Sequence, residues 1–199
     1  MEGPRNGEAA EHKARKYKAR KYKARKCKES EMAENFEVCC LNHIASKCRD
    51  AEETRAFYED ILGMPLAHVV KADVVPSTGE KLDYVHIFFK MRDNSFVAFF
   101  DLGDGKATFP DEDTPMWTNH LAMDVGSMDE LRAARDRLKQ AGVKVTEVID
   151  HHWLQSIYFQ DPNDLRVELS YRSIGPEFFE QHKHDPHDTL DQWTKQKKN

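Results

Sequence analysis

The sequence of 199 residues contains no long hydrophobic run. No stretch approaches the 18 or so consecutive apolar residues of a membrane-spanning helix, and the N-terminus lacks the apolar segment of a secretory signal. A membrane-embedded protein and a secreted protein are therefore both disfavoured, and we expect a cytoplasmic location.

Cysteine is also scarce, and the four cysteines lie in the first quarter of the chain: Cys27, Cys39, Cys40 and Cys48. Their spacing fits neither a metal site nor a disulfide framework, which agrees with a reduced compartment. The adjacent Cys39 and Cys40 are interpreted as buried strand residues rather than as a redox pair.

The net charge of −5 is unevenly distributed. Residues 11–30 hold ten Lys or Arg and two Glu, so the rest of the chain has 20 basic and 33 acidic residues, a net charge of −13. A body this acidic disfavours nucleic-acid binding, which would have to come from the basic segment alone.

The basic segment is a five-residue repeat over residues 13–28: KARKY, KARKY and KARKC, followed by Lys28. It has no apolar face and places like charges at every turn, which predicts a disordered tail over residues 1–31. The tail is either an arm that binds polyanions or an extension before a natural start at Met32. We favour the second interpretation, in which folding and activity do not require the tail.

The rest of the chain reads as two copies of one unit, which is the strongest pattern in the sequence. LNHIA at 41–45 and TNHLA at 118–122 lie 77 positions apart. Each lies in a predicted strand, 36–46 or 118–125, and each is followed by a helix whose predicted N-cap lies seven residues after the histidine. The remaining strands are predicted at 66–71, 84–91 and 96–102 in the first copy and at 143–149, 155–159 and 165–171 in the second.

The repeated histidines, His43 and His120, occupy equivalent positions in the two copies. Two copies that pair about a pseudo-twofold axis bring equivalent residues together near that axis. Glu168 lies in the last strand between Val167 and Leu169, where an unpaired charge is costly to bury. A lone strand histidine is most often a core residue. Two at equivalent positions with an isolated carboxylate favour the ligand set of non-haem Fe(II) oxygenases, which leaves metal positions free.

On these residues, 36–172 resembles the vicinal oxygen chelate superfamily, which includes glyoxalase I, fosfomycin-resistance transferases and extradiol dioxygenases. The resemblance implies an α+β fold in which two βαβββ modules, 36–103 and 117–172, form a curved mixed sheet around a metal site and are flanked by helices. The superfamily's three metal ligands match His43, His120 and Glu168. Residues 173–199 lie beyond the resemblance as a C-terminal extension, for which Phe178, Phe179 and Trp193 are possible anchors.

Two motifs bear on the branch of the superfamily. Glyoxalase I has a fourth ligand, a Glu on the last strand of the first module, where this sequence has Phe99 or Phe100, with Asp101 one or two residues late. The sequence matches the extradiol signature at His151, Ile157-Tyr158, Asp161-Pro162 and Glu168. It departs from the signature only at Asp164, where Gly or Pro is expected. A three-ligand site of the extradiol type is therefore favoured.

The resemblance implies an Fe(II)-dependent dioxygenase that cleaves a catechol-like aromatic diol with O2, in which His151 moves protons and Tyr158 donates a hydrogen bond. An equally weighted alternative is that His151 is an exposed loop histidine, in which case His152 could take its place. For Tyr158 the equal alternative is a plain core aromatic residue. His86 is interpreted as core or pocket lining.

Two rival functions remain open. One is a lyase, isomerase or thiol transferase of the same superfamily that uses Mn, Zn, Ni or Co instead of iron, and the other is a non-catalytic module that binds a small molecule. The resemblance also implies a homodimer.

Overall fold

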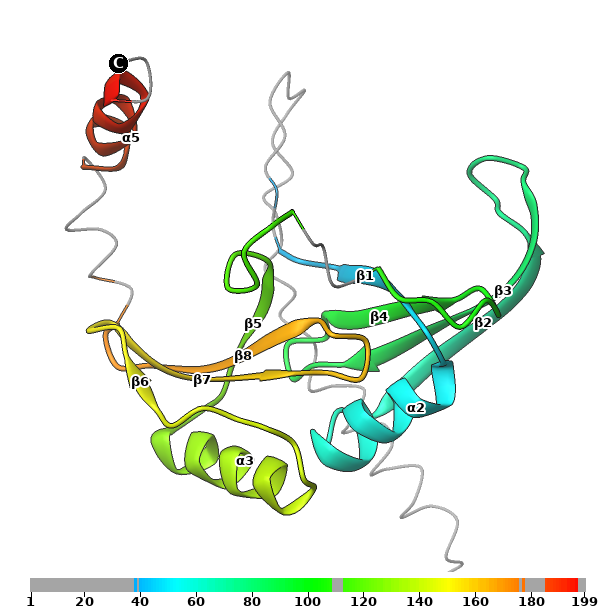
Figure 1. The fold of residues 1–199 in the computed structure, drawn as a ribbon, viewed down its shortest axis with the longest axis horizontal. Coiled ribbons are helices and arrows are strands. Elements are labelled where there is room, and N and C mark those ends of the chain that lie inside the picture. The colour runs from blue at the N-terminus through cyan, green and yellow to red at the C-terminus, as the bar shows by residue number, and fades with distance from the viewer. Residues whose placement is uncertain (1–37, 39, 109–112, 176, 178–184, 197–199) are drawn as a thin grey trace, which may run out of the picture. The chain divides into compact units, whose positions relative to one another are not determined.

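The computed structural model describes residues 38, 40–108, 113–175, 177 and 185–196 (Figure 1). The described helices and strands lie in the compact unit Asn42–Asn199. Residues 1–31, Cys39, Phe178 and Phe179 lie outside the described residues, so the expectations about them stay predictions. Within the described part, no helix is both long and apolar enough to span a membrane.

The first module consists of β1 (His43–Cys48), α2 (Ala51–Arg55), η1 (Ala56–Ile61), β2 (Leu66–Val74), β3 (Lys81–Lys90) and β4 (Phe96–Asp101). Its four strands are ordered β1-β4-β3-β2, and only the β1–β4 pair is parallel. The predicted N-cap is confirmed, because the Asp50 carboxylate accepts the N–H of Glu53 at 2.7 Å. From Ala56 the helix widens into a π-helix, and Gly63, with φ 74°, lets the chain turn away.

The second module repeats this plan with β5 (His120–Asp124), α3 (Met128–Gln140), β6 (Ile149–Asp150), β7 (Leu154–Gln160) and β8 (Arg166–Arg172). Its sheet has the order β5-β8-β7-β6, again with a single parallel pair, β5–β8. The predicted N-cap Ser127 accepts the N–H of Glu130 at 3.1 Å. A further helix, α5 (Asp185–Gln196), carries Trp193, whose side chain is exposed. The predicted α+β fold of two βαβββ modules is confirmed.

Each sheet turns one face toward its own helix, and these faces form the hydrophobic core (Figure 1). Because side chains alternate along a strand, the sheet faces that point away from the helices carry polar and aromatic residues, and these faces are where a functional site can lie. The largest core side chains that are fully buried are Tyr58, Phe89, Phe99, Leu131, Leu138, Ile157, Val97 and Val167.

A buried polar network connects the two modules. The hydroxyl of Tyr58 donates to the Asp161 carboxylate at 3.0 Å, and the amide of Asn163 donates to the hydroxyl of Thr54 at 3.1 Å. The carbonyl oxygen of the Asn163 side chain accepts the backbone N–H of Arg49 at 2.9 Å. Burial raises the pKa of both Tyr58 and Asp161, and the hydrogen bond between them partly compensates for this cost.

Two details of the predicted structure are wrong. Residues 143–149 do not form a continuous strand: Val145 makes an isolated bridge to Phe159, and β6 is limited to two residues. The hydroxyl of Thr146 accepts the N–H of Tyr158 at 3.0 Å and so replaces a ladder hydrogen bond. Cys40 is exposed and lies outside any strand, because β1 begins only at His43, whereas Cys48 is buried.

Candidate metal centre

His120 and Glu168, two of the three predicted ligands, lie together on the second sheet. His120 begins β5, Glu168 lies in the middle of the neighbouring β8, and both side chains are on the face opposite α3. The Nε2 atom of His120 is 3.2 Å from Oε2 of Glu168, and the Glu168 side chain is only 6% exposed. An imidazole and a carboxylate at this separation can share a cation or a proton.

Two serine hydroxyls hold the Glu168 carboxylate in place. Its Oε1 atom accepts from Ser156 at 2.5 Å and from Ser170 at 2.8 Å, and both serines are buried. Burial opposes the charge on Glu168, but the hydrogen bonds from these serines and from Tyr158, together with nearby His120, lower its pKa overall. Glu168 is therefore an anion whose Oε2 atom is directed at His120.

His151 and Tyr158, the predicted catalytic pair, are also brought together beside Glu168. The Tyr158 hydroxyl lies 2.9 Å from Nε2 of His151, and Tyr158 is directly opposite Glu168 in the β7–β8 ladder. Burial and the charge of Glu168 raise the pKa of Tyr158, so its hydroxyl keeps its proton at neutral pH. His151, His120, Tyr158 and Glu168 line one cavity of about 380 Å³.

His43, the third predicted ligand, lies on the first sheet. Its ring contacts His86 and Phe88, with centroid separations of 6.1 and 5.7 Å. Within the described part of the chain, no three His, Cys, Asp or Glu side chains are close enough together to hold a metal ion. The predicted ligands of a single chain therefore fall into two groups, which we call half-sites: His43 on the first sheet, and His120 with Glu168 on the second.

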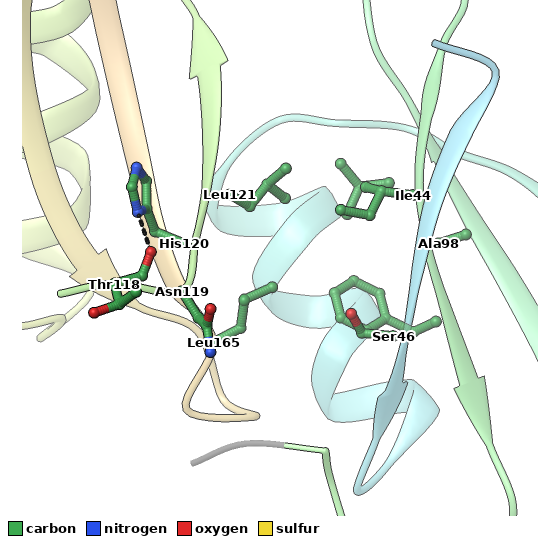
Figure 2. A pocket seen from close by; sticks show the side chains of 10 residues that line it. Ile44, Ser46, Ala98, Thr118, Asn119, His120, Leu121 and Leu165 are labelled. Atoms are coloured by element: carbon green, nitrogen blue, oxygen red, sulfur yellow. Dashed lines mark hydrogen bonds between the residues drawn. The ribbon is translucent and has the colours of Figure 1, made fainter. Parts of the chain in front are cut away.

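A second cavity of about 380 Å³ lies between β1 and β5, the edge strands that carry the two histidines. Ile44 and Leu121 point toward one another across it, and His120 turns toward Thr118 (Figure 2). Ile44 follows His43 in β1, so alternation directs the His43 side chain away from this cavity, whereas His120 is among the residues that line it.

Both histidines have a hydrogen-bond acceptor next to Nδ1. The Nδ1 atom of His120 is 3.2 Å from the carbonyl oxygen of Thr118, and Nδ1 of His43 is 2.6 Å from the side-chain oxygen of Asn42. An acceptor at Nδ1 keeps the proton there and leaves Nε2 free to bind a metal, which is how metal-binding histidines are commonly held. With the Glu168 carboxylate, these donor atoms fit a divalent cation of the iron type.

Asp101 has a different role from a fourth ligand. Its carboxylate accepts the backbone N–H of Ala51 at 2.9 Å and that of Gly103 at 2.7 Å. Phe99, at one of the two matching positions, is fully buried in the core. Neither residue is available to a metal.

His86 is the residue near the half-sites whose importance the sequence did not reveal. Its ring stacks on Phe100 with a centroid separation of 3.6 Å, and its Nε2 atom is buried without a hydrogen-bond partner in the described structure. Burial, with smaller contributions from His43 and His68, lowers its pKa to about 4. His86 is thus a neutral imidazole next to a proposed ligand. The strand pattern contains the clue, since alternation places it opposite the core residue Ile87.

The depressed pKa of His86 predicts a loss of stability in acid. Its pKa is about 4 in the folded protein against an ordinary 6.5, so the unfolded chain binds the proton more readily between these values. The free energy of unfolding contributed by this group is complete above pH 6.5 and is lost as the pH falls toward about 4. Urea unfolding of metal-free His86→Gln across this range should show a flatter pH dependence than wild type. Equal slopes would contradict the shift.

Comparison with known proteins identifies the family of the chain. Residues 40–169 match the family described as the Glyoxalase/Bleomycin resistance protein/Dioxygenase superfamily. The chain belongs to this superfamily. As its description states, the superfamily contains glyoxalases, resistance proteins and dioxygenases, so membership establishes the fold and leaves the reaction to be argued from the site.

Two biphenyl-2,3-diol 1,2-dioxygenases, from Metapseudomonas furukawaii and Paraburkholderia xenovorans strain LB400, are each 23% identical to this superfamily member over 134 residues. The match covers 66% of the chain and 40% of each relative, so the chain spans less than half of their length. A solved superfamily domain from Frankia sp. EAN1pec shares the fold, with 19% identity, a TM-score of 0.57, and 70% of this chain and 96% of that chain covered.

Proposed function

We propose that the protein is an Fe(II)-dependent extradiol-type dioxygenase that cleaves a catechol-like diol with O2. The observation that carries the proposal is the His120–Glu168 pair, in which Thr118 holds the imidazole and two buried serines hold the carboxylate. The adjacent His151–Tyr158 pair favours this reaction over the other chemistries of the superfamily. The weak similarity to two aromatic-diol dioxygenases points the same way.

His43, His120 and Glu168 would hold the ion, which when bound supplies Lewis acidity and a common binding position for the diol and O2. The residues of the chain do the rest. Glu168 remains ionised, and the Tyr158 hydroxyl lies against His151 in the same cavity. His151, in hydrogen-bond contact with Tyr158, accepts a proton from the diol and returns it during ring opening.

The two half-sites must come together for this chemistry. We infer a homodimer in which a second copy supplies His43, because β1 is an edge strand and His43 on it is exposed. In one chain the two half-sites lie on different sheets, and no three potential ligands of the described residues are grouped closely enough to hold a metal.

The proposed function is tested by the metal content and oxygen chemistry of protein purified without added metal. We expect bound iron, and after anaerobic loading with Fe(II) we expect O2 consumption and a yellow ring-fission product with catechols. Zinc or nickel without O2 consumption would replace the dioxygenase with a lyase or isomerase of the same superfamily. A protein that binds no metal would be a binding module.

Tyr158→Phe should lower kcat by about 10- to 100-fold, because the hydroxyl that contacts His151 is lost and general acid–base steps typically contribute at least this much. Metal content and the melting temperature should stay near those of wild type. The matched control is Tyr84→Phe, in the first module and outside the His120–Glu168 cavity. Unchanged kcat in Tyr158→Phe would restrict Tyr158 to packing.

A further inference from the structure

Arg166 lies on the same face of β8 as Glu168, two residues away. Its guanidinium carbon is 4.4 Å from the centroid of the Tyr158 ring, over the ring face. This cation–π contact holds the charged group beside the proposed catalytic tyrosine. In the β5–β8 ladder, Arg166 is also the direct neighbour of His120.

Unlike the nearby arginines, Arg166 has no acidic partner among the described residues. Its Nε atom is buried and makes no hydrogen bond in the described structure. Arg172, on the same strand, pairs with Asp124 at 2.8 Å, and Arg135, whose Nε atom is also buried without a hydrogen bond, still pairs with Glu147 through a terminal nitrogen at 2.9 Å. A half-buried guanidinium donor without an acceptor is costly, and it is unexpected in a chain with an excess of acidic residues.

The space around Arg166 can accommodate a ligand. Arg166 lines a cavity of about 680 Å³, whose walls combine apolar side chains such as Phe57 and Val145 with the charged residues Glu53, Lys144 and Asp161. Tyr158 lines this cavity and also the cavity of His120 and Glu168. The two cavities therefore adjoin at Tyr158, over whose ring the guanidinium lies.

We propose that Arg166 binds an anionic group of the substrate, so that the substrate is an aromatic diol bearing a carboxylate. This inference rests on the proposed function for the diol and on Arg166 alone for the carboxylate. The guanidinium is planar, and its two terminal amino groups can donate parallel hydrogen bonds to the two oxygens of a carboxylate. The stacked Tyr158 ring orders the guanidinium before the substrate arrives.

The alternative is that Arg166 only covers the Tyr158 ring and offsets the charge of Glu168. In that case Arg166→Gln would change the melting temperature and would weaken neutral and anionic ligands equally. A carboxylate subsite instead requires a selective effect on anionic ligands.

The first test uses metal-free protein and is independent of turnover. Benzoate should bind to wild type, and its Kd should rise by about tenfold or more in Arg166→Gln, because a charge-assisted hydrogen bond is lost. Benzyl alcohol, the neutral comparison, should bind equally to both proteins. The control Arg132→Gln removes an exposed arginine that pairs with Asp129 on α3, and it should leave benzoate binding unchanged. Equal benzoate affinity in wild type and Arg166→Gln would overturn the proposal.

The second test separates the subsite from the proposed function. With Fe(II)-loaded protein, Arg166→Gln should raise KM for 3,4-dihydroxybenzoate by about tenfold and leave KM for catechol unchanged. Arg166→Lys keeps the positive charge but lacks the planar guanidinium, so its KM for 3,4-dihydroxybenzoate should lie between those of wild type and Arg166→Gln. Arg166-dependent benzoate binding without turnover would sustain the subsite and refute the dioxygenase. Turnover in which Arg166→Gln changes KM equally for both diols would support the dioxygenase and refute the carboxylate subsite.

Discussion

Glu168→Gln is expected to remove the bound metal and the activity while leaving the fold intact. A structural zinc site with four ligands contributes about 10–16 kcal/mol, so one lost ligand corresponds to roughly 3 kcal/mol, or about a 100-fold drop in affinity. Activity with any diol should fall at least 100-fold as well, because most of the variant protein would carry no metal ion. Metal analysis after dialysis and O2 uptake measure the two effects.

The fold should tolerate this substitution because the amide oxygen of Gln can still accept from Ser156 or Ser170. Single Ser156→Ala and Ser170→Ala variants should show a smaller loss of metal affinity, about tenfold, since these serines only orient the ligand. Glu147→Gln is the matched control, because Glu147 is an exposed glutamate of the same module that pairs with Arg135 and Lys139. If Glu168→Gln retained metal as wild type does, Glu168 would be a buried structural carboxylate.

The helices and most strands could be predicted from the sequence because their determinants are local. Asp50 and Ser127 cap their helices through hydrogen bonds to residues three positions on, and Gly63 and Gly142 adopt positive φ where the helices end. The π-helix from Ala56 has no such local signature. Its wider turn accompanies the burial of Phe57 and Tyr58 against residues far along the chain.

Residues 143–149 show why an alternating apolar pattern can mislead. Val143, Val145 and Val148 pack against the core, which satisfies the pattern without requiring a hydrogen-bonded ladder. The side chain of Thr146 takes the N–H of Tyr158, a local alternative to strand pairing that is typical of threonine. Periodicity reports which side chains are buried and is silent about which backbone groups pair.

The duplicated motif predicted the equivalence of His43 and His120 but could not predict their separation. Strand alternation determines the sheet face on which each histidine lies, and the acceptor next to each Nδ1 atom determines how its ring is oriented. The spacing between modules depends on the Tyr58–Asp161 and Thr54–Asn163 hydrogen bonds, which join residues more than 100 positions apart. No local pattern in the sequence announces these contacts.

Mixing two inactive variants is expected to restore activity if a second copy supplies His43. His43→Ala and His120→Ala should each be inactive alone, because every site in either protein lacks one imidazole. In a mixed dimer, one site combines the intact His43 of the His120→Ala chain with the intact His120 and Glu168 of the other chain. Since random pairing makes half of the dimers mixed and each has one complete site, activity should recover to about a quarter of wild type.

The partner variants determine which chain completes the site. Mixing His120→Ala with Glu168→Gln should restore nothing, because both changes fall on the same half-site, where His120 and Glu168 are 3.2 Å apart. Unfolding and refolding the mixtures together ensures exchange, and differently tagged chains allow the mixed dimer to be isolated and its iron counted. One iron in the mixed dimer of His43→Ala and His120→Ala, and none in the other mixture, is the expected result. No iron in either would mean that the two half-sites of a single chain close on one another across the cavity between β1 and β5.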